Sequence, residues 1–382
     1  MSDNWEVTSL EKFAFIEMGQ SPSGETCNQD GVGLPLLNGP TEFGGYHPMP
    51  VQFTTDPKKY ASPNDILFCV RGSTTGRMNW ADQKYAIGRG IAAIRHRKGS
   101  EYRYFLKAII DFHLPVLLAS ATGSTFPNVS REQLANLQCE VPPLPEQRAI
   151  ARILGALDDK IEVNRRMNVT LESVARAVFR QWLMENEESE NWEVGRLGDV
   201  AENIRRGANP NQINPDTHYI GLEHMPRKSI GLAEWSNASA LESNKFSFKA
   251  GEFLFGKLRP YFHKVGIAPV DGVCSTDILV IAPKSPEWYG FVLGHISSTE
   301  LINYTDSAST GTKMPRTNWS DIAKYEVVLP PVSLVQKYNE IFLPMAEKIR
   351  ANILESRTLT SLRDSLLPKL MRGEVRVKGM EV

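Results

Sequence analysis

The chain contains the same pattern of short segments twice. Matching segments recur at a shift of 187 or 188 residues, about half of the 382-residue chain. The four pairs are NWEV at residues 4–7 and 191–194, DILF at 65–68 and EFLF at 252–255, TGS at 122–124 and TGT at 310–312, and VPP at 141–143 and LPP at 329–331. A solenoid repeat usually has a period of ~20–50 residues. The longer shift therefore indicates a duplicated domain, and the differences between its two copies are informative about function.

The bulk composition is that of a globular protein with apolar cores. Hydrophobic residues make up 41% and charged residues 23% of the chain, and its length suffices for two to three domains of ~100–200 residues. No apolar run approaches the ~20 residues of a membrane span, and the N-terminus lacks the basic and apolar stretches of a secretory signal. We therefore expect a cytoplasmic protein that has no membrane partner.

Neither the cysteines nor the net charge indicates a particular ligand. The four cysteines are scattered without a CxxC pair, which argues against a disulfide framework or a structural zinc site. The formal net charge is −1, whereas nucleic-acid-binding domains are often basic. Any DNA-binding surface must therefore be a local cluster of basic residues, with the acidic residues elsewhere.

Each copy is predicted to be a mixed α/β unit. Short apolar runs bounded by glycine and polar residues are typical of strands, and stretches with helical spacing follow them. The predicted strands cover residues 66–70 and 90–94 in the first copy and 253–255 and 278–281 in the second, and the helical stretches cover 104–114 and 288–297. We place the two globular units at residues 1–143 and 188–331.

A long amphipathic helix is predicted after each unit, within residues 144–187 and 332–382. Residues 146–184 contain no proline, and their apolar residues recur at intervals of three and four, as in a coiled-coil seam. The seam consists of Ile150, Leu154, Leu157, Ile161, Asn164, Asn168, Leu171, Ala175, Val178 and Trp182, and its counterpart of Tyr338, Phe342, Met345, Ile349, Asn352, Ser356, Leu359, Arg363, Leu366 and Leu370. A helix of ~39 residues extends about 58 Å. Such a stripe cannot be buried within one small unit, so we expect the two helices to pack together.

Polar residues and prolines add detail to this pattern. Asn164 and Asn352 occupy equivalent seam positions, where a polar residue reduces stability but fixes register and partner. Pro344 and Pro368 lie inside the second helix, so we expect a kink or break near each. Gly373 is a candidate C-cap. The order of the repeat alone allows parallel or antiparallel helices.

The entries into the two helices resemble those of a known protein family. The segments that carry the resemblance are VPPLPEQR at residues 141–148, LPPV at 329–332 and RGEVRV at 372–377. Together with the two units and the long helices, they make essentially the whole chain similar to the specificity subunit of type I restriction–modification systems. The second entry departs from the family pattern, because SLVQ at residues 333–336 replaces the Pro-Glu-Gln entry.

The resemblance implies an α+β fold and a DNA-reading function. Two mixed α/β target recognition domains in a pseudo-twofold arrangement would be separated by two long helices that form an antiparallel coiled coil. Each domain would recognise one half of a bipartite, asymmetric DNA site. The implied partners are double-stranded DNA, two methyltransferase subunits, and restriction/translocase subunits that join through the complex. The subunit itself would be non-catalytic, with no cofactor and no metal site.

Basic and hydroxyl residues follow the matched strands of both copies. Residues 71–77 combine glycines, hydroxyls and two arginines, and their counterpart is residues 257–264. Arginine and lysine can bind phosphates or guanine edges, and small residues in a second pair of loops, 122–125 and 310–316, allow close approach to a phosphate. The candidate DNA-binding residues are Arg71, Ser73, Arg77, Ser124, Lys257, Arg259, Tyr261, His263, Lys264, Lys313 and Arg316.

Two other functions remain open at this point. A coiled-coil scaffold with two divergent protein- or glycan-binding heads is compatible with the near-neutral charge, and the named arginines could be ordinary solvated turn residues. An unrecognised enzyme is the second alternative. The chain contains no NPPY or DPPY methyltransferase tetrad, no GxGxxG after a strand, no Walker phosphate loop and no HExxH motif. Its seven histidines do not cluster at metal-ligand spacing.

Overall fold

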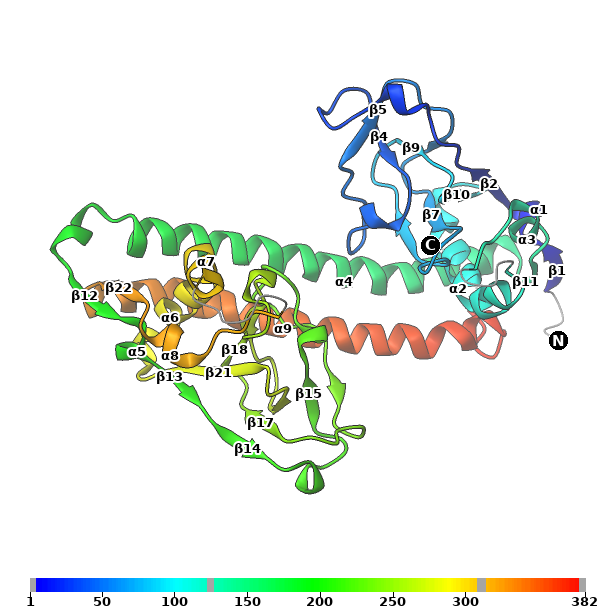
Figure 1. Cartoon of the computed structure of the whole chain (residues 1–382). Helices are drawn as coiled ribbons and strands as arrows, with labels where there is room; N and C mark the ends of the chain where they lie inside the picture. Colours follow the sequence, from blue (N-terminus) through cyan, green and yellow to red (C-terminus); the bar gives the residue numbers. More distant parts are fainter. Residues whose placement is uncertain (1–4, 122–126, 308–313, 378–382) are drawn as a thin grey trace. The chain divides into compact units, whose positions relative to one another are not determined.

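The computed structural model describes residues 5–121, 127–307 and 314–377 (Figure 1). The chain divides into two compact units. Unit 1 comprises residues 1–162 and 359–382, and unit 2 comprises residues 163–358. Each unit therefore contains one globular part together with portions of both long helices.

The framework of unit 1 is a four-stranded antiparallel sheet in the order β2-β10-β7-β8, beside a two-stranded sheet of β1 and β11. Strand β7 is central and buried on both faces, which explains its uninterrupted apolar sequence. The strand bounds are β1 (Glu6–Ser9), β2 (Ala14–Met18), β7 (Ile66–Cys69), β8 (Met78–Trp80), β10 (Ile91–His96) and β11 (Gln138–Val141). Both strands predicted in the first copy are thus confirmed, as β7 and β10.

Unit 2 repeats this framework. Its four-stranded sheet has the order β13-β21-β18-β19, and β12 pairs with β22. The bounds are β12 (Glu193–Arg196), β13 (Ala201–Ile204), β18 (Phe253–Gly256), β19 (Val265–Ile267), β21 (Ile278–Pro283) and β22 (Glu326–Leu329). The predicted strands of the second copy are confirmed as β18 and β21. The duplication seen in the sequence is therefore a duplication of strand pairing as well.

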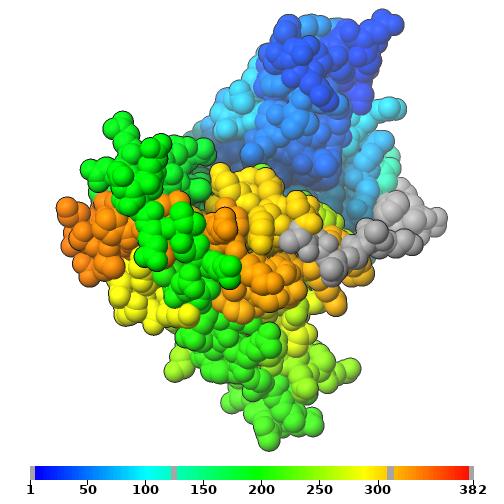
Figure 2. Space-filling model, turned by 60° about the vertical axis from the view of Figure 1, so that its left-hand side comes forward, coloured from blue at the N-terminus to red at the C-terminus, as the bar shows by residue number. Residues whose placement is uncertain are grey.

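Each unit also contains a five-stranded sheet, and the two sheets differ in the position of one strand. The ladder β6-β9-β4-β5 in unit 1 corresponds to β17-β20-β15-β16 in unit 2, each with a parallel pair at its centre. The fifth strand lies at opposite edges, because β3 pairs with β5 whereas β14 pairs with β17. The bounds are β3 (Cys27–Asn28), β4 (Leu34–Leu37), β5 (Gln52–Thr54), β6 (Tyr60–Ala61), β9 (Tyr85–Ile87), β14 (Arg206–Ala208), β15 (His218–Ile220), β16 (Ser236–Asn237), β17 (Lys245–Phe248) and β20 (Gly272–Cys274). In unit 1 this sheet and its loops, in shades of blue, form a lobe of the surface (Figure 2).

The helix beside each four-stranded sheet also differs between the units. Helix α2 (Arg103–Ala119) is continuous, whereas its counterpart is divided into α6 (Tyr289–Ile296) and α7 (Thr299–Ser307). Ser298 lies at the break and its hydroxyl accepts a hydrogen bond from the N–H of Leu301, which caps α7. The two predicted helical stretches are confirmed. The short helices are α1 (Leu10–Phe13), α3 (Arg131–Ala135), α5 (Leu197–Val200) and α8 (Trp319–Ala323).

Both long helices form. Helix α4 (Leu144–Phe179) continues into a π-helical turn at Arg180–Met184, and α9 spans Val332–Met371. Every residue of both predicted seams is buried or half-buried. The antiparallel direction follows from contacts within each unit. In unit 1 Arg363 pairs with Asp158 at 2.8 Å, and in unit 2 the Tyr338 hydroxyl donates to the Ala175 carbonyl at 3.2 Å. Within unit 2 the contacting residues of α9 fall in number as those of α4 rise, from Ser356 with Asn164 through Asn352 with Asn168 to Tyr338 with Ala175, as antiparallel pairing requires.

The break expected at the prolines of α9 does not occur, whereas a kink at either proline stays a prediction. The helix runs through Pro344 and Pro368 without interruption, although an interior proline removes one backbone hydrogen bond and costs about 3 kcal/mol. Pro344 is exposed, and so are Glu340 and Asp364, whose carbonyls lose their partners. Water can bind these carbonyls, while the buried seam residues on either side keep the helix in place. The predicted end is confirmed, because Gly373 has a φ of 66° and its N–H donates to the Leu370 carbonyl.

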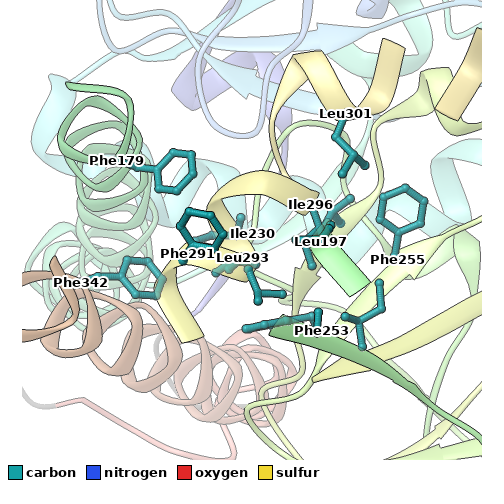
Figure 3. Packing of buried hydrophobic residues seen from close by; sticks show 14 of the residues in the cluster. Phe179, Leu197, Ile230, Phe253, Phe255, Phe291, Leu293, Ile296, Leu301 and Phe342 are labelled. Atoms are coloured by element: carbon teal, nitrogen blue, oxygen red, sulfur yellow. The ribbon is translucent and has the colours of Figure 1, made fainter. Parts of the chain in front are cut away.

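Aromatic side chains join the long helices of unit 2 to its globular part. Phe179 from α4 and Phe342 from α9 both point toward Phe291 of α6 (Figure 3). The ring centroids of Phe179 and Phe291 lie 6.4 Å apart, and burial of each ring contributes roughly 1.5–3 kcal/mol. In unit 1, Ile150 and Leu154 of α4 belong to the same apolar cluster as residues of α2 and the C-terminal part of α9. The helices are therefore part of the core of each unit.

Candidate nucleic-acid interface

In each unit two loops meet, and the two meeting points occupy equivalent positions in the repeat. Loop junction 1 consists of residues 70–77, which connect β7 to β8, and residues 127–129. Loop junction 2 consists of residues 257–264, which connect β18 to β19, and residues 315–317. The N–H of Val129 donates to the Val70 carbonyl at 2.8 Å, and the N–H of Thr317 donates to the Lys257 carbonyl at 3.0 Å. The two hydrogen bonds are equivalent under the repeat, so both junctions have the same backbone frame.

Glycines shape loop junction 1. Gly72 and Gly76 have φ values of 97° and 91°, a region in which side chains with a Cβ are strained. A Cβ on Gly76 would also lie 2.8 Å from the Leu114 side chain. The Thr75 hydroxyl is within 2.8 Å of the carbonyls of Gly72 and Pro127 and so connects the two segments. The loop is therefore a fixed turn rather than an open linker.

Loop junction 2 also has two residues with positive φ, but neither is a glycine. Arg259 and His263 flank the short 3₁₀ turn Pro260–Phe262 and have φ values of 52° and 51°. Left-handed backbone at non-glycine residues is costly and often occurs where function constrains a loop. The N–H of Arg259 donates to the Pro315 carbonyl at 2.8 Å, which holds the turn against the second segment.

The candidates in unit 1 differ in what they contact. Arg71 and Ser73 are exposed. Arg77 is also exposed, but its guanidinium donates to the carbonyls of Phe43 and Gly44 at 3.0 and 3.3 Å and lies 5.8 Å from the Phe43 ring. Arg77 therefore braces the loop after β4. The candidate Ser124 lies outside the described residues.

Three candidates of unit 2 face the surface to different extents. Tyr261 is 48% exposed, and Lys257 is half-buried. Arg316 is exposed, and its guanidinium lies 3.4 Å from the Asp277 carboxylate. An exposed ion pair of this kind contributes little to stability, so Arg316 can exchange this partner for another anion. The candidate Lys313 lies outside the described residues.

The other three candidates of unit 2 serve packing. His263 is 7% exposed, and its Nε2 donates to the Ser297 carbonyl at 2.8 Å. Burial lowers the pKa of His263, which favours the neutral ring. The Lys264 ammonium donates to the Leu222 carbonyl at 2.5 Å, and burial, with the nearby Arg227, lowers its pKa. Arg259 is half-buried with its guanidinium 5.9 Å from the Phe262 ring. DNA contact by these residues stays a prediction.

Two residues at the junctions were missed from the sequence. Asn128 is exposed, and its backbone forms an isolated antiparallel β-bridge with that of Arg71 across loop junction 1. Arg227 is exposed and lies over the Phe262 ring of loop junction 2, with its guanidinium 4.1 Å from the ring centroid. The signal for Asn128 was available, because PNV at residues 127–129 aligns with PRT at 315–317 at the same shift. Arg227 has no comparable signal in the sequence.

Neither a metal-ligand cluster nor a membrane-spanning helix is present in the described part of the chain. Within residues 5–121, 127–307 and 314–377, no three His, Cys, Asp or Glu side chains are arranged to hold a metal ion. No helix in the described part of the chain is long and apolar enough to cross a membrane. A cavity of about 400 Å³ in unit 2 is lined by aromatic residues of α4 and α9 and by His263.

Comparisons with known proteins agree with this architecture. A family model described as the type I restriction modification DNA specificity domain matches twice, at residues 2–173 and 189–355. A putative type I restriction enzyme MjaX specificity subunit from Methanocaldococcus jannaschii is 36% identical over 179 residues, which are 46% of this chain and 42% of that protein. The MjaIX specificity subunit of the same organism is 24% identical over 99% of this chain and 95% of its own length.

A solved structure shows the same fold. The crystal structure of the type I restriction–modification S subunit from M. genitalium aligns with a TM-score of 0.60 and 17% identity, covering 97% of both chains. Both family matches contain a four-stranded framework sheet and a loop junction, and together they include most of the chain. The chain belongs to the family of type I restriction–modification specificity subunits.

Proposed function

We propose that this chain reads a bipartite, asymmetric DNA sequence. Each globular unit, at residues 1–143 and 188–331, would bind one half-site through its loop junction. The chain would direct two methyltransferase subunits, and through them the restriction/translocase subunits, to that site. It would act by binding alone, without catalytic groups of its own.

The observation that supports this proposal best is the preserved frame with altered side chains. Both junctions keep equivalent backbone hydrogen bonds, Val129 to Val70 and Thr317 to Lys257. The side chains around them differ, and so do the five-stranded sheets. Identical readers would favour a palindromic site, as symmetric dimers do. Two different readers on one frame are suited to an asymmetric site.

The long helices support the spacing part of the proposal. Helix α4 leads without interruption from Leu144, beside β11, to Phe179. A continuous helix is stiff, whereas a flexible linker would allow many separations of the two half-sites. The 36 residues of α4 rise about 54 Å at ~1.5 Å each, which corresponds to about 16 base pairs at ~3.4 Å each. This figure is an upper bound on the unread gap.

Methylome sequencing tests the proposal directly. Adenine and cytosine methylation would be mapped in a host with and without the gene for this chain, with the partner genes present in both strains. We expect one split motif to disappear on deletion and to return with the gene on a plasmid. If no split motif depends on the gene, the chain does not direct methylation.

An exchange of globular units tests whether each unit reads one half of the motif independently of the other. Replacing residues 1–143 by the corresponding unit of another family member should change one half of the motif and leave the other half and the gap unchanged. A change in both halves would contradict independent reading.

Salt titration of duplex binding by the assembled complex distinguishes DNA reading from a protein-binding scaffold, because phosphate contacts release counterions and make affinity fall steeply with salt.

A further inference from the structure

We infer that two pairs of bridge residues, Arg71 with Asn128 and Leu258 with Arg316, determine which base pairs the two units select. This inference rests on the proposed function and adds residues and chemistry to it. Each pair forms an isolated antiparallel bridge between the two segments of its loop junction. The two bridges are equivalent under the repeat.

The backbone geometry places each pair on one outward face. Residues opposite each other in an antiparallel bridge have their Cβ atoms about 4.5–5.5 Å apart on the same face, and the next residue along points to the other face. The next residues are Val129 and Thr317, which are 0% and 2% exposed. Because these side chains point into the core, those of Asn128 and Arg316 point outward, and both are exposed.

The bridge pair has different side chains in the two units, and its arginine stands on a different segment in each. In unit 1 the arginine stands on the first segment and faces an asparagine, whereas in unit 2 the arginine stands on the second segment and faces a leucine. Arginine can donate two hydrogen bonds to guanine, asparagine can pair with both N6 and N7 of adenine, and an apolar side chain suits the thymine methyl group. The same backbone frame therefore presents different base-reading groups in the two units.

Contacts within the protein distinguish Arg71 and Arg316 from the other basic residues of the loop junctions. Arg77 donates to three carbonyls of its own unit, and the Lys264 ammonium donates to the Leu222 carbonyl. Among the described residues no carboxylate pairs with Arg71, and Arg316 has only the 3.4 Å contact to Asp277 at the surface. Arg71 and Arg316 are thus the basic side chains of the junctions that are best able to reach a base edge.

Motif sequencing of single variants tests the inference. In the strain used for methylome mapping, Arg71→Ala should relax one position in the half-motif read by unit 1, and Arg316→Ala one position in the other half. Loss of a bidentate base contact should reduce discrimination at that position by about tenfold to a hundredfold. Arg71→Lys keeps the charge but not the planar fork, so it should relax the same position.

Arg131→Ala is the matched control, because Arg131 is an exposed arginine that lies two residues after Val129 and outside loop junction 1. It should leave both half-motifs unchanged. If the Arg71 and Arg316 variants also leave both halves unchanged, the inference is wrong. A variant that methylates nothing would be assembled with its partners and selected on randomised duplexes. Relaxed selection at one position supports base reading, whereas equal weakening for all sequences overturns it. A wild-type strain without a split motif would instead refute the proposed function.

Discussion

The side-chain amide of Asn352 donates a hydrogen bond of 2.8 Å to the side-chain oxygen of Asn168 across the helix pair of unit 2. The equivalent residue, Asn164, donates to Ser356 at 3.3 Å and to Glu355 at 2.8 Å. Asn164 and Asn352 are both fully buried. The two contacts are related by the repeat, since Ser356 is the counterpart of Asn168. A polar residue in an apolar seam stabilises the register in which it finds its partner, and here both asparagines favour the same antiparallel register.

We predict that Asn352→Ala destabilises unit 2 by about 1–3 kcal/mol, because it leaves a half-buried Asn168 amide oxygen without its donor. Replacing both Asn352 and Asn168 by leucine should restore or raise the melting temperature, since it removes the Asn168 oxygen together with the buried Asn352 oxygen, which has no hydrogen-bond partner among the described residues. The double variant should nevertheless form additional oligomers, because only the Asn164 contacts then specify the register. Thermal unfolding and light scattering after size exclusion measure the two effects. Glu347→Ala, an exposed change on the same helix, should alter neither.

The ion pair between Arg363 and Asp158 gives a corresponding prediction for unit 1. The Arg363 guanidinium lies 2.8 Å from the Asp158 carboxylate, whose side chain is 9% exposed. We expect Arg363→Ala to destabilise unit 1 by about 2–4 kcal/mol, since removal of one partner leaves a nearly buried charge unpaired. Leucine at both positions should recover most of the loss. Chemical denaturation would reveal it, and a double variant less stable than Arg363→Ala would contradict this explanation.

His295 should make the stability of unit 2 depend on pH. Burial lowers the pKa of this histidine to about 4, and neither ring nitrogen has a hydrogen-bond partner among the described residues. Between the ordinary value of about 6.5 and 4, the unfolded chain binds a proton that the folded chain does not, so stability falls as the pH is lowered through this window. The loss should approach about 3 kcal/mol near pH 4.

His295→Leu should remove this part of the pH dependence. It should also raise stability at pH 7, because a buried ring with two unpaired nitrogens is replaced by an apolar side chain. His218→Leu is the control, since His218 is exposed in the same unit and its replacement should leave the pH dependence intact. Melting temperatures measured from pH 4 to pH 7.5 would show the difference. Equal slopes for the wild-type chain and His295→Leu would assign the effect to other groups.

The sequence predicted those elements whose pattern extends over many residues or recurs in the second copy. The seams of α4 and α9 repeat over ten positions, and β7 and β18 are short but appear twice with apolar residues on both faces. The sheet of β3, β4, β5, β6 and β9 escaped prediction because its strands have only two to four residues. Segments this short carry no periodicity, and long-range pairing decides their structure.

The candidate site was predicted as a position and not as a set of contacts. Residues 71–77 and 257–264 do form equivalent loops, but the sequence could not distinguish Arg77, which braces a neighbouring loop, from Arg71, which does not. The partner of Arg71 comes from residue 128, far along the chain, so only the fold brings the pair together. The uninterrupted course of α9 through Pro344 has a similar cause, because buried neighbours outweigh a local preference.

The length of the helix pair should set the gap between the half-sites. Because Asn164 faces Ser356 and Asn168 faces Asn352, the centre of this symmetric region lies near residues 166 and 354. Insertion of one heptad after each of these two residues keeps the seam in phase, since seven residues complete two turns of a coiled coil. The helices lengthen by about 10 Å at ~1.5 Å per residue, which equals about three base pairs at ~3.4 Å each. Motif sequencing should therefore show the same two half-motifs with a gap about three base pairs longer. An insertion of two residues in each helix is the control, because it rotates the seam by about 200° and should abolish methylation. Changed half-motifs with an unchanged gap would show that the helices do not act as the spacer.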